Sequence, residues 1–243
     1  MIQKTLYRFI RWCVKTIYRK YEVLGKENLP EGPYVIIGNH CQIHGPIVAQ
    51  LYMPEKSITW GIGDMMHAKD IPSYAYRDFW SEKPKSVRWI FKICSYLIVP
   101  LAVLIFNNAD MIGVYHDKRI LGTFKESLAA LCDGKNLVIF PECPTERNNI
   151  IFEFQEGYAD LGRMYGKKTQ RKLPFVPMYV APDLKQIWFG KPEEFDFSAN
   201  GADERKRVNQ VMMDRVTKLG QSLPLHVVVP YRNVDKKEYP KNR

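Results

Sequence analysis

His40, Arg119 and Glu142 are the side chains of this 243-residue sequence whose type and place best suit chemistry. An imidazole titrates near neutrality, so His40 can take a proton from a hydroxyl group. A guanidinium such as Arg119 can bind a phosphate through two parallel hydrogen bonds. Glu142 follows an apolar run and needs partners for its charge. Thr145 and Arg147, in the same loop, add a hydroxyl and a cation.

The elements that must position these side chains are predicted from apolar runs and helical periods. Strands are expected at residues 34–38, 57–61, 111–115, 136–140, 175–180 and 187–189. Helices are expected at residues 46–53, 118–132, 155–165 and 203–219, with a long loop of short helical turns at 64–86. This alternation predicts an α/β class with a mixed, mainly parallel sheet flanked by helices. Sites in such sheets lie beyond the carboxyl ends of strands, which is where the three side chains stand.

Each signal has an ordinary structural interpretation when it is taken alone. A single histidine after a strand is more often structural, and a lone arginine there is more often a surface residue. His40 and His44 have the spacing of two metal ligands on a helix, and the thiols of Cys41 and Cys143 are further potential ligands. The glutamate of a metalloprotease helix is missing between the histidines, and small buried cysteines need no chemistry. The sequence therefore favours no metal site.

Four segments taken together change this balance. In chain order they are IGNHCQIHGP, GVYHDKR, VIFPECPTER and PFVPMYV. Over residues 25–192 the chain resembles the glycerophospholipid acyltransferase family, whose best-known members make phosphatidic acid from lysophosphatidic acid. That family has NH-x4-D after a strand, a segment that ends in an arginine, FPEG-T-R, and a strand with V-P. The resemblance implies O-acyl transfer from an acyl thioester, either acyl-CoA or acyl-carrier protein, to a glycerophosphate or lysophospholipid hydroxyl.

The resemblance also implies a role for each matching residue. His40 corresponds to the general base that deprotonates the acceptor hydroxyl. The substrate-binding residues that it implies are Arg119 for the acceptor phosphate, with Glu142, Thr145 and Arg147 from the third motif. Thr145 and Arg147 match only if this loop is longer by one or two residues. The supporting residues are Asn39, His44 and Pro177. The thioester is a co-substrate, and no other cofactor is expected.

One departure from the family pattern affects the catalytic residue itself. The acid five positions after the histidine is replaced by Gly45. Loss of such a partner costs about 10⁴-fold in rate in a serine-protease triad. Glu142 or Asp64 is left as a substitute in space. The alternative function is therefore a weakened or inactive lipid-binding relative of the same family.

Residues 2–21 show a helical period with a basic stripe and an apolar stripe. Lysines and arginines at positions 4, 8, 11, 15 and 19 fall on one side, and no acid occurs before Glu22. Aromatic residues border the apolar stripe, which is typical of a helix that lies in a bilayer interface. A helix packed on the domain is the alternative. A second apolar stretch, residues 89–106, contains Pro100 and predicts a core helix or a dip into one leaflet rather than a full span.

Charge and cysteine content limit the partners and the compartment. The net charge of +10 attracts an anionic membrane or a phosphate-bearing substrate, and no nucleic-acid motif accompanies it. The basic runs at 167–172 and 205–207 are also explained by a solvated face. Five scattered cysteines with no CxxC pair, and no secretory signal, predict a reducing setting. We expect a helix at residues 1–22, an α/β domain at 23–243, and a peripheral or monotopic protein on the cytoplasmic face of the membrane.

Overall fold

The computed structural model describes residues 2–18, 20–81 and 84–243, apart from the side chains of Ile2, Phe79, Glu146 and Arg147. By its internal contacts the chain forms two compact units. Residues 1–17 and 60–123 form unit 1, and residues 18–59 and 124–243 form unit 2. The predicted domain boundary between residues 22 and 23 stays a prediction.

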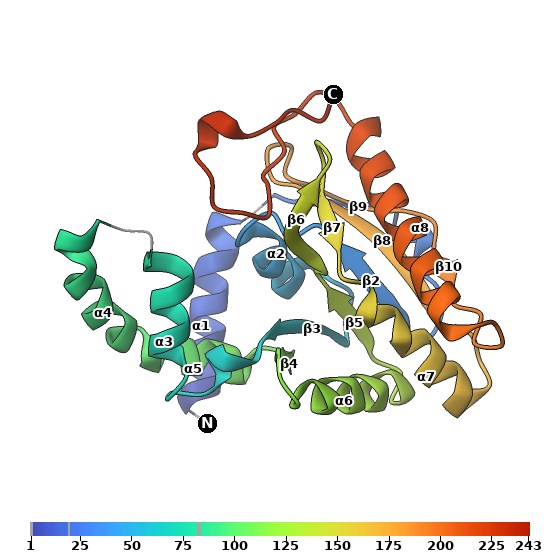
Figure 1. The fold of residues 1–243 in the computed structure, drawn as a ribbon, viewed down its shortest axis with the longest axis horizontal. Helices are drawn as coiled ribbons and strands as arrows, with labels where there is room; N and C mark the ends of the chain where they lie inside the picture. The colour runs from blue at the N-terminus through green and yellow to red at the C-terminus, as the bar shows by residue number, and fades with distance from the viewer. Residues whose placement is uncertain (1, 19, 82–83) are drawn as a thin grey trace. The chain divides into compact units, whose positions relative to one another are not determined.

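A mixed, mainly parallel sheet organises unit 2 (Figure 1). Its strand order is β1-β9-β8-β2-β5-β3, with β10 beside β8. The bounds are β1 Glu22–Leu24, β2 Val35–Gly38, β3 Ser57–Ile62, β5 Asn136–Ile139, β8 Pro174–Ala181, β9 Gln186–Phe189 and β10 Glu193–Glu194. The pairs β1–β9, β2–β5, β2–β8 and β3–β5 are parallel, and β8 pairs antiparallel with β9 and β10. The predicted class is confirmed.

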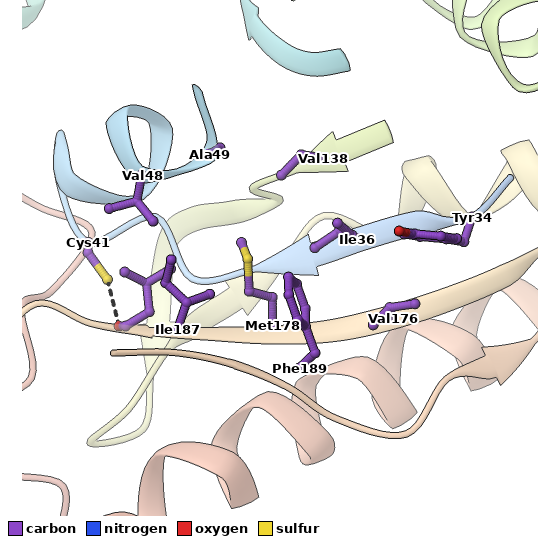
Figure 2. Packing of buried hydrophobic residues seen from close by; sticks show 11 residues of the cluster. Tyr34, Ile36, Cys41, Val48, Ala49, Val138, Val176, Met178, Ile187 and Phe189 are labelled. Carbon is purple, nitrogen blue, oxygen red and sulfur yellow. Dashed lines mark hydrogen bonds between the residues drawn. The ribbon is translucent and has the colours of Figure 1, made fainter. Parts of the chain in front are cut away.

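The two faces of this sheet alternate along each strand, as the pleat requires. On β8, Val176 and Met178 join a cluster that includes Ile36 of β2 and Val48 of helix α2, His44–Tyr52 (Figure 2). Phe175, Pro177 and Tyr179 of β8 alternate with Val176 and Met178, so they face the other side of the sheet, and they are buried as well. Continuous burial explains why β2 and β8 read as apolar runs instead of alternating ones.

Helices α6, α7 and α8 complete the α/β pattern. They span Ile120–Cys132, Asp160–Thr169 and Gly201–Ser222, and the short helix η5, Glu156–Ala159, precedes α7. The prediction that a helix ends at Tyr165 is wrong, because α7 continues through Gly166 to Thr169. A Cβ on Gly166 would lie 2.3 Å from the ring of Phe197, so this glycine allows close contact and does not stop the helix.

Besides the short strands β1 and β10, a hairpin and the C-terminal segment of unit 2 have no counterpart in the predicted elements. Strands β6, Glu142–Arg147, and β7, Phe152–Phe154, form an antiparallel hairpin directly after β5. Residues 226–243 form a closed C-terminal segment, red in Figure 1, in which Val227 bridges Lys241. Asn242 fixes the base of the segment, because its buried amide donates to Gly220 and Leu223 and its oxygen accepts from the His226 N–H.

Unit 1 is mainly helical. Its elements are α1 Ile2–Ile17, η2 Gly63–Met66, α3 Ile71–Ala75, the π-helical turn Tyr76–Trp80, η4 Lys85–Val87, α4 Arg88–Leu97, α5 Val99–Asn108 and β4 Met111–Val114. The short helical turns predicted for 64–86 are therefore present. A small core of Met65, Ile71 and Ala102 joins η2, α3 and α5.

The apolar stretch 89–106 is bent where the sequence predicts it. Helices α4 and α5 meet at Ile98, and Pro100 takes the second position of α5, where its missing N–H breaks no helical bond. Among the described residues no single helix is long and apolar enough to cross a membrane. The pair Lys85–Leu97 and Val99–Asn108 meets that requirement only jointly, with a bend of 44°.

Candidate functional site

Asn39 ties the exit of β2 to the neighbouring strand β8. Its side chain is buried and bonds both backbone groups of Val180. The Oδ1 atom accepts from the Val180 N–H at 2.7 Å, and Nδ2 donates to the Val180 carbonyl at 3.0 Å. The amide thus continues the sheet's hydrogen bonding one residue beyond the strand. It fixes the place at which His40 leaves the sheet.

The turn after His40 has an unusual backbone. Cys41 and Gln42 both have positive φ angles, 48° and 55°, which non-glycine residues rarely adopt. Each such residue costs on the order of 1–3 kcal/mol, and strain of this kind is found most often at functional sites. The turn closes where the Gly45 N–H donates to the His40 carbonyl at 3.0 Å. Helix α2 begins within this turn, at His44.

Glu142 holds the same turn from the end of β5. Its side chain is buried, and its two oxygens accept from the backbone N–H groups of His40 at 2.5 Å and Phe152 at 2.9 Å. Burial raises the pKa of Glu142 to about 7, and the two N–H donors oppose that rise. Because β2 and β5 are adjacent and parallel, residues about 100 positions apart meet at one sheet edge.

The His40 ring is held by aromatic side chains. Its centroid lies 5.6 Å from that of Phe140 and 5.2 Å from that of Tyr231, both edge-on, at 71° and 84°. The Nδ1 atom is buried and has no hydrogen-bond partner among the described residues. Burial lowers the pKa of His40 to about 4, and the Gln42 backbone opposes this lowering. The imidazole is therefore neutral at physiological pH.

Neither substitute acid for the missing aspartate bonds the His40 ring. The Glu142 carboxylate bonds the backbone of His40. Asp64 belongs to unit 1 and bonds Arg119. Position 45 has no room for a side chain, because a Cβ there would lie 2.5 Å from the His40 carbonyl oxygen and 2.9 Å from that of Asn39. The glycine is thus required by the shape of the turn.

Arg119 lies in unit 1, after β4, with an exposed guanidinium. Its Nε atom donates to both oxygens of Asp117 at 3.0 and 2.9 Å, and Nη2 donates to Asp64 at 3.2 Å. Hydrogen bonding to Asp117 raises the pKa of Arg119 and lowers that of Asp117. The guanidinium also covers the Tyr115 ring, with its central carbon 4.1 Å from the centroid. A phosphate would have to replace a carboxylate here.

The site predicted from the sequence contains four other residues, and the three whose side chains are described lie in different environments. Thr145 donates to Glu153 at 2.8 Å across the β6–β7 hairpin, and the side chain of Arg147 lies outside the described residues. His44 Nδ1 is 2.9 Å from the Tyr18 hydroxyl. Pro177 is buried in β8 opposite Ile37 of β2, which is a structural position.

Two of the three residues in the basic run 205–207 form ion pairs. Arg205 pairs with Glu156 and Asp160, and Arg207 pairs with Glu193 and Glu204. These pairs fix α8 to η5, α7 and β10, so residues 205–207 serve the fold. No group of three His, Cys, Asp or Glu side chains among the described residues is arranged to hold a metal ion.

Sequence reasoning missed the C-terminal residues near His40. Besides Tyr231 beside the ring, the Gln42 amide donates to the Arg232 carbonyl at 3.1 Å and to the Tyr239 hydroxyl at 2.8 Å. These partners are about 190 residues apart in the chain. No local pattern marks such a contact, because a C-terminal segment without periodicity gives no hint of what it covers.

Comparison with known proteins identifies the fold. The crystal structure of the 1-acyl-sn-glycerophosphate acyltransferase PlsC from Thermotoga maritima is similar, with a TM-score of 0.52 and 14% sequence identity. The match covers 91% of this chain and 83% of that one. No family model matches the sequence. No curated protein matches it either. At this identity the likeness shows a shared fold over most of both chains.

Proposed function

We propose that this chain is an O-acyltransferase that moves a fatty acyl group from an acyl thioester to a hydroxyl of a glycerophosphate or lysophospholipid. One observation carries the proposal. The histidine and glutamate of two resembling motifs meet at adjacent parallel strand ends, joined by the bond from the His40 N–H to Glu142. The PlsC-like fold over 91% of the chain supports the same reaction class.

In the proposed reaction His40 acts as the general base. Its neutral imidazole takes the proton of the acceptor hydroxyl while the oxygen attacks the thioester carbonyl. The tetrahedral intermediate then collapses, the carbon–sulfur bond breaks, and the thiolate leaves and takes the proton back. Asn39 and Glu142 do not react in this scheme. They hold the turn from which the imidazole projects.

The acceptor phosphate is assigned to Arg119. A guanidinium offers the paired donors that a phosphate needs. Its present partners, Asp117 and Asp64, are partly exposed carboxylates, so a phosphate can replace one of them at modest cost. Acyl-CoA and acyl-carrier protein both remain candidate donors, because each presents a thioester.

Attachment to an anionic membrane on its cytoplasmic face is part of the same proposal. Leu6, Phe9 and Trp12 on α1 are about half exposed or more, at 47%, 59% and 62%. At about 100° per residue Leu6 and Phe9 face away from the stripe of Lys4 and Arg8, and Trp12 stands at its border. Such a helix suits the interface of an anionic bilayer, to which each basic residue adds about 1 kcal/mol.

A second candidate function is a lipid-binding protein of this fold without turnover. It is favoured by the absence, within the described chain, of a carboxylate bonded to the His40 ring. An imidazole without such a partner is a poorer base, because nothing stabilises the imidazolium that forms. This candidate keeps the same acceptor and membrane contacts.

An acyl-transfer assay with the purified full chain separates the two functions. Acyl-CoA and acyl-carrier protein are each tested with glycerol 3-phosphate and with lysophosphatidic acid. The first function requires turnover that is lost in His40→Gln and kept in His67→Gln, which changes an exposed histidine of unit 1. Lysolipid binding with no turnover for any pair of substrates would instead establish the second.

A further inference from the structure

The His40 ring is surrounded on two sides by rings from distant parts of unit 2. Phe140 follows β5, and Tyr231 comes from the C-terminal segment, residues 226–243. Tyr231 is the nearer of the two, at 5.2 Å, and its plane is almost perpendicular to the imidazole. It also contacts Phe152 of β7 edge-on, at 6.0 Å. Tyr231 therefore links the imidazole to the hairpin to which Glu142 also belongs.

The segment that carries Tyr231 is held both at its base and near its tip. At its base, Asn242 binds the end of α8 and the N–H of His226. Near its tip, the Gln42 amide bonds the carbonyl of Arg232, the residue next to Tyr231, and the hydroxyl of Tyr239. Gln42 belongs to the His40 turn, so the turn and the segment hold each other.

The left-handed backbone of the turn serves this link. Two consecutive positive φ angles, at Cys41 and Gln42, turn the chain sharply after His40. No glycine relieves them, and a side chain at position 42 is needed for the bonds to the segment. Backbone strain at the end of a strand is typical of a site in which the exact position of a side chain matters.

We propose that Tyr231 is the positioning residue for His40, and that it takes the orienting role that a carboxylate has in the family that the sequence resembles. This inference rests on the proposed function. The geometry explains why an aromatic ring and not a carboxylate would orient His40. A carboxylate at position 45 is excluded by the His40 and Asn39 carbonyls, whereas the Phe140 and Tyr231 rings, both steeply inclined to the imidazole, restrict its rotation. Aromatic contact supplies orientation but no charge, so the base stays neutral.

Other titratable and charged groups lie near the turn that carries His40. Those groups do not shift the His40 pKa themselves: Glu142 bonds the His40 backbone and adds to the effect of burial in raising the pKa of Cys41, and Lys236 of the C-terminal segment adds to the effect of burial in lowering the pKa of His44. Burial remains the main cause of the lowered pKa of His40. Removal of the Tyr231 ring admits water to one side of the imidazole, so the pKa of His40 should rise toward its ordinary value near 6.5.

The test compares Tyr231→Leu, Tyr231→Phe and a control, Asn233→Ala, which changes an exposed residue of the same segment. We expect Tyr231→Leu to lower kcat about tenfold with little change in KM, and Tyr231→Phe to restore it. NMR titration of the histidine rings, assigned with His40→Gln, should show a raised His40 pKa in the leucine variant only. Gln42→Asn, which keeps the amide but shortens it, should act in the same direction if Tyr231→Leu does not fold.

The kcat and the titration together show whether Tyr231 positions His40 or only stabilises the fold. An unchanged kcat together with an unchanged His40 titration in Tyr231→Leu overturns the inference. If the wild-type chain shows no turnover at all, the proposed function fails, and the positioning role that rests on it fails as well. Wild-type turnover with an unchanged kcat and titration in Tyr231→Leu overturns the positioning role alone.

Discussion

Restoring the family's acid at position 45 should damage this protein. The perturbation is Gly45→Asp, with Gly45→Ala to separate size from charge. A Cβ at this position would lie 2.5 Å from the His40 oxygen, 2.9 Å from the Asn39 oxygen and 3.0 Å from the His40 carbonyl carbon. All three are backbone atoms of the strained turn, which cannot move as a flexible side chain does.

The magnitude follows from steric and polar costs. Overpacking costs about 1–3 kcal/mol, and the better helix propensity of alanine returns about 1 kcal/mol. We therefore expect Gly45→Ala to lose up to about 2 kcal/mol of unfolding free energy. In Gly45→Asp a buried carboxylate also faces two carbonyl acceptors, which adds about 2 kcal/mol. A total of about 2–4 kcal/mol corresponds to a fall in Tm of about 10 °C for a chain of this size.

Thermal and urea unfolding of the full chain measure these losses. Gly122→Ala is the matched control, because that helical glycine has open space around its Cβ position and should gain up to about 1 kcal/mol. Acyl transfer is measured in parallel, and no gain is expected from the aspartate. An aspartate variant that is as stable as the wild type and turns over faster would refute the steric argument and mark Gly45 as a lost acid.

Three further predictions follow from the site and from unit 1. Burial raises the pKa of Glu142 from 4.5 to about 7, so its contribution to the unfolding free energy falls as pH rises through that window. Burial lowers the pKa of His40 from 6.5 to about 4, so its contribution rises by about 3 kcal/mol between pH 4 and 6.5. Urea unfolding of Glu142→Gln, compared with the wild type, should lose the Glu142 fall and keep the His40 rise. Trp12→Asp should reduce flotation with anionic vesicles more than Thr16→Asp, which adds the same charge on the same helix without removing apolar surface. Arg119→Ala should raise KM for a phosphate-bearing acceptor about tenfold or more and leave the donor KM unchanged, whereas equal effects on both would contradict its assignment.

Much of the fold was predictable because its strands are buried on both faces. Residues 34–38 and 175–180 are continuous apolar runs, and they form adjacent parallel strands. The prediction that His40 and Glu142 stand beyond the carboxyl ends of strands follows from the same patterns, whereas the adjacency of the two strands comes from the structure. The hairpin β6–β7 was missed because ECPTER lacks the alternation of a half-buried strand, and β1 because three residues give no period.

The candidate site was predictable only where it is local. Asn39, His40 and Glu142 stand in short motifs next to strong strands, so their placement could be read from sequence. The surroundings of the imidazole could not, because Tyr231 and Gln42 reach it through contacts about 190 residues apart. Gly45 was interpreted as a missing acid, and only the turn geometry reveals its steric reason.

The rate that this arrangement permits can be bounded from its contacts. Loss of an orienting carboxylate costs about 10⁴-fold, or about 5.5 kcal/mol of transition-state stabilisation. An edge-to-face aromatic pair contributes about 0.5–1.5 kcal/mol, so Phe140 and Tyr231 together can hold the ring in place with about 1–3 kcal/mol. Orientation by rings thus recovers at most about a hundredfold, and a deficit of at least about a hundredfold remains, since neither ring stabilises the imidazolium. Turnover as fast as that of an enzyme with a His–Asp pair would therefore contradict this bound.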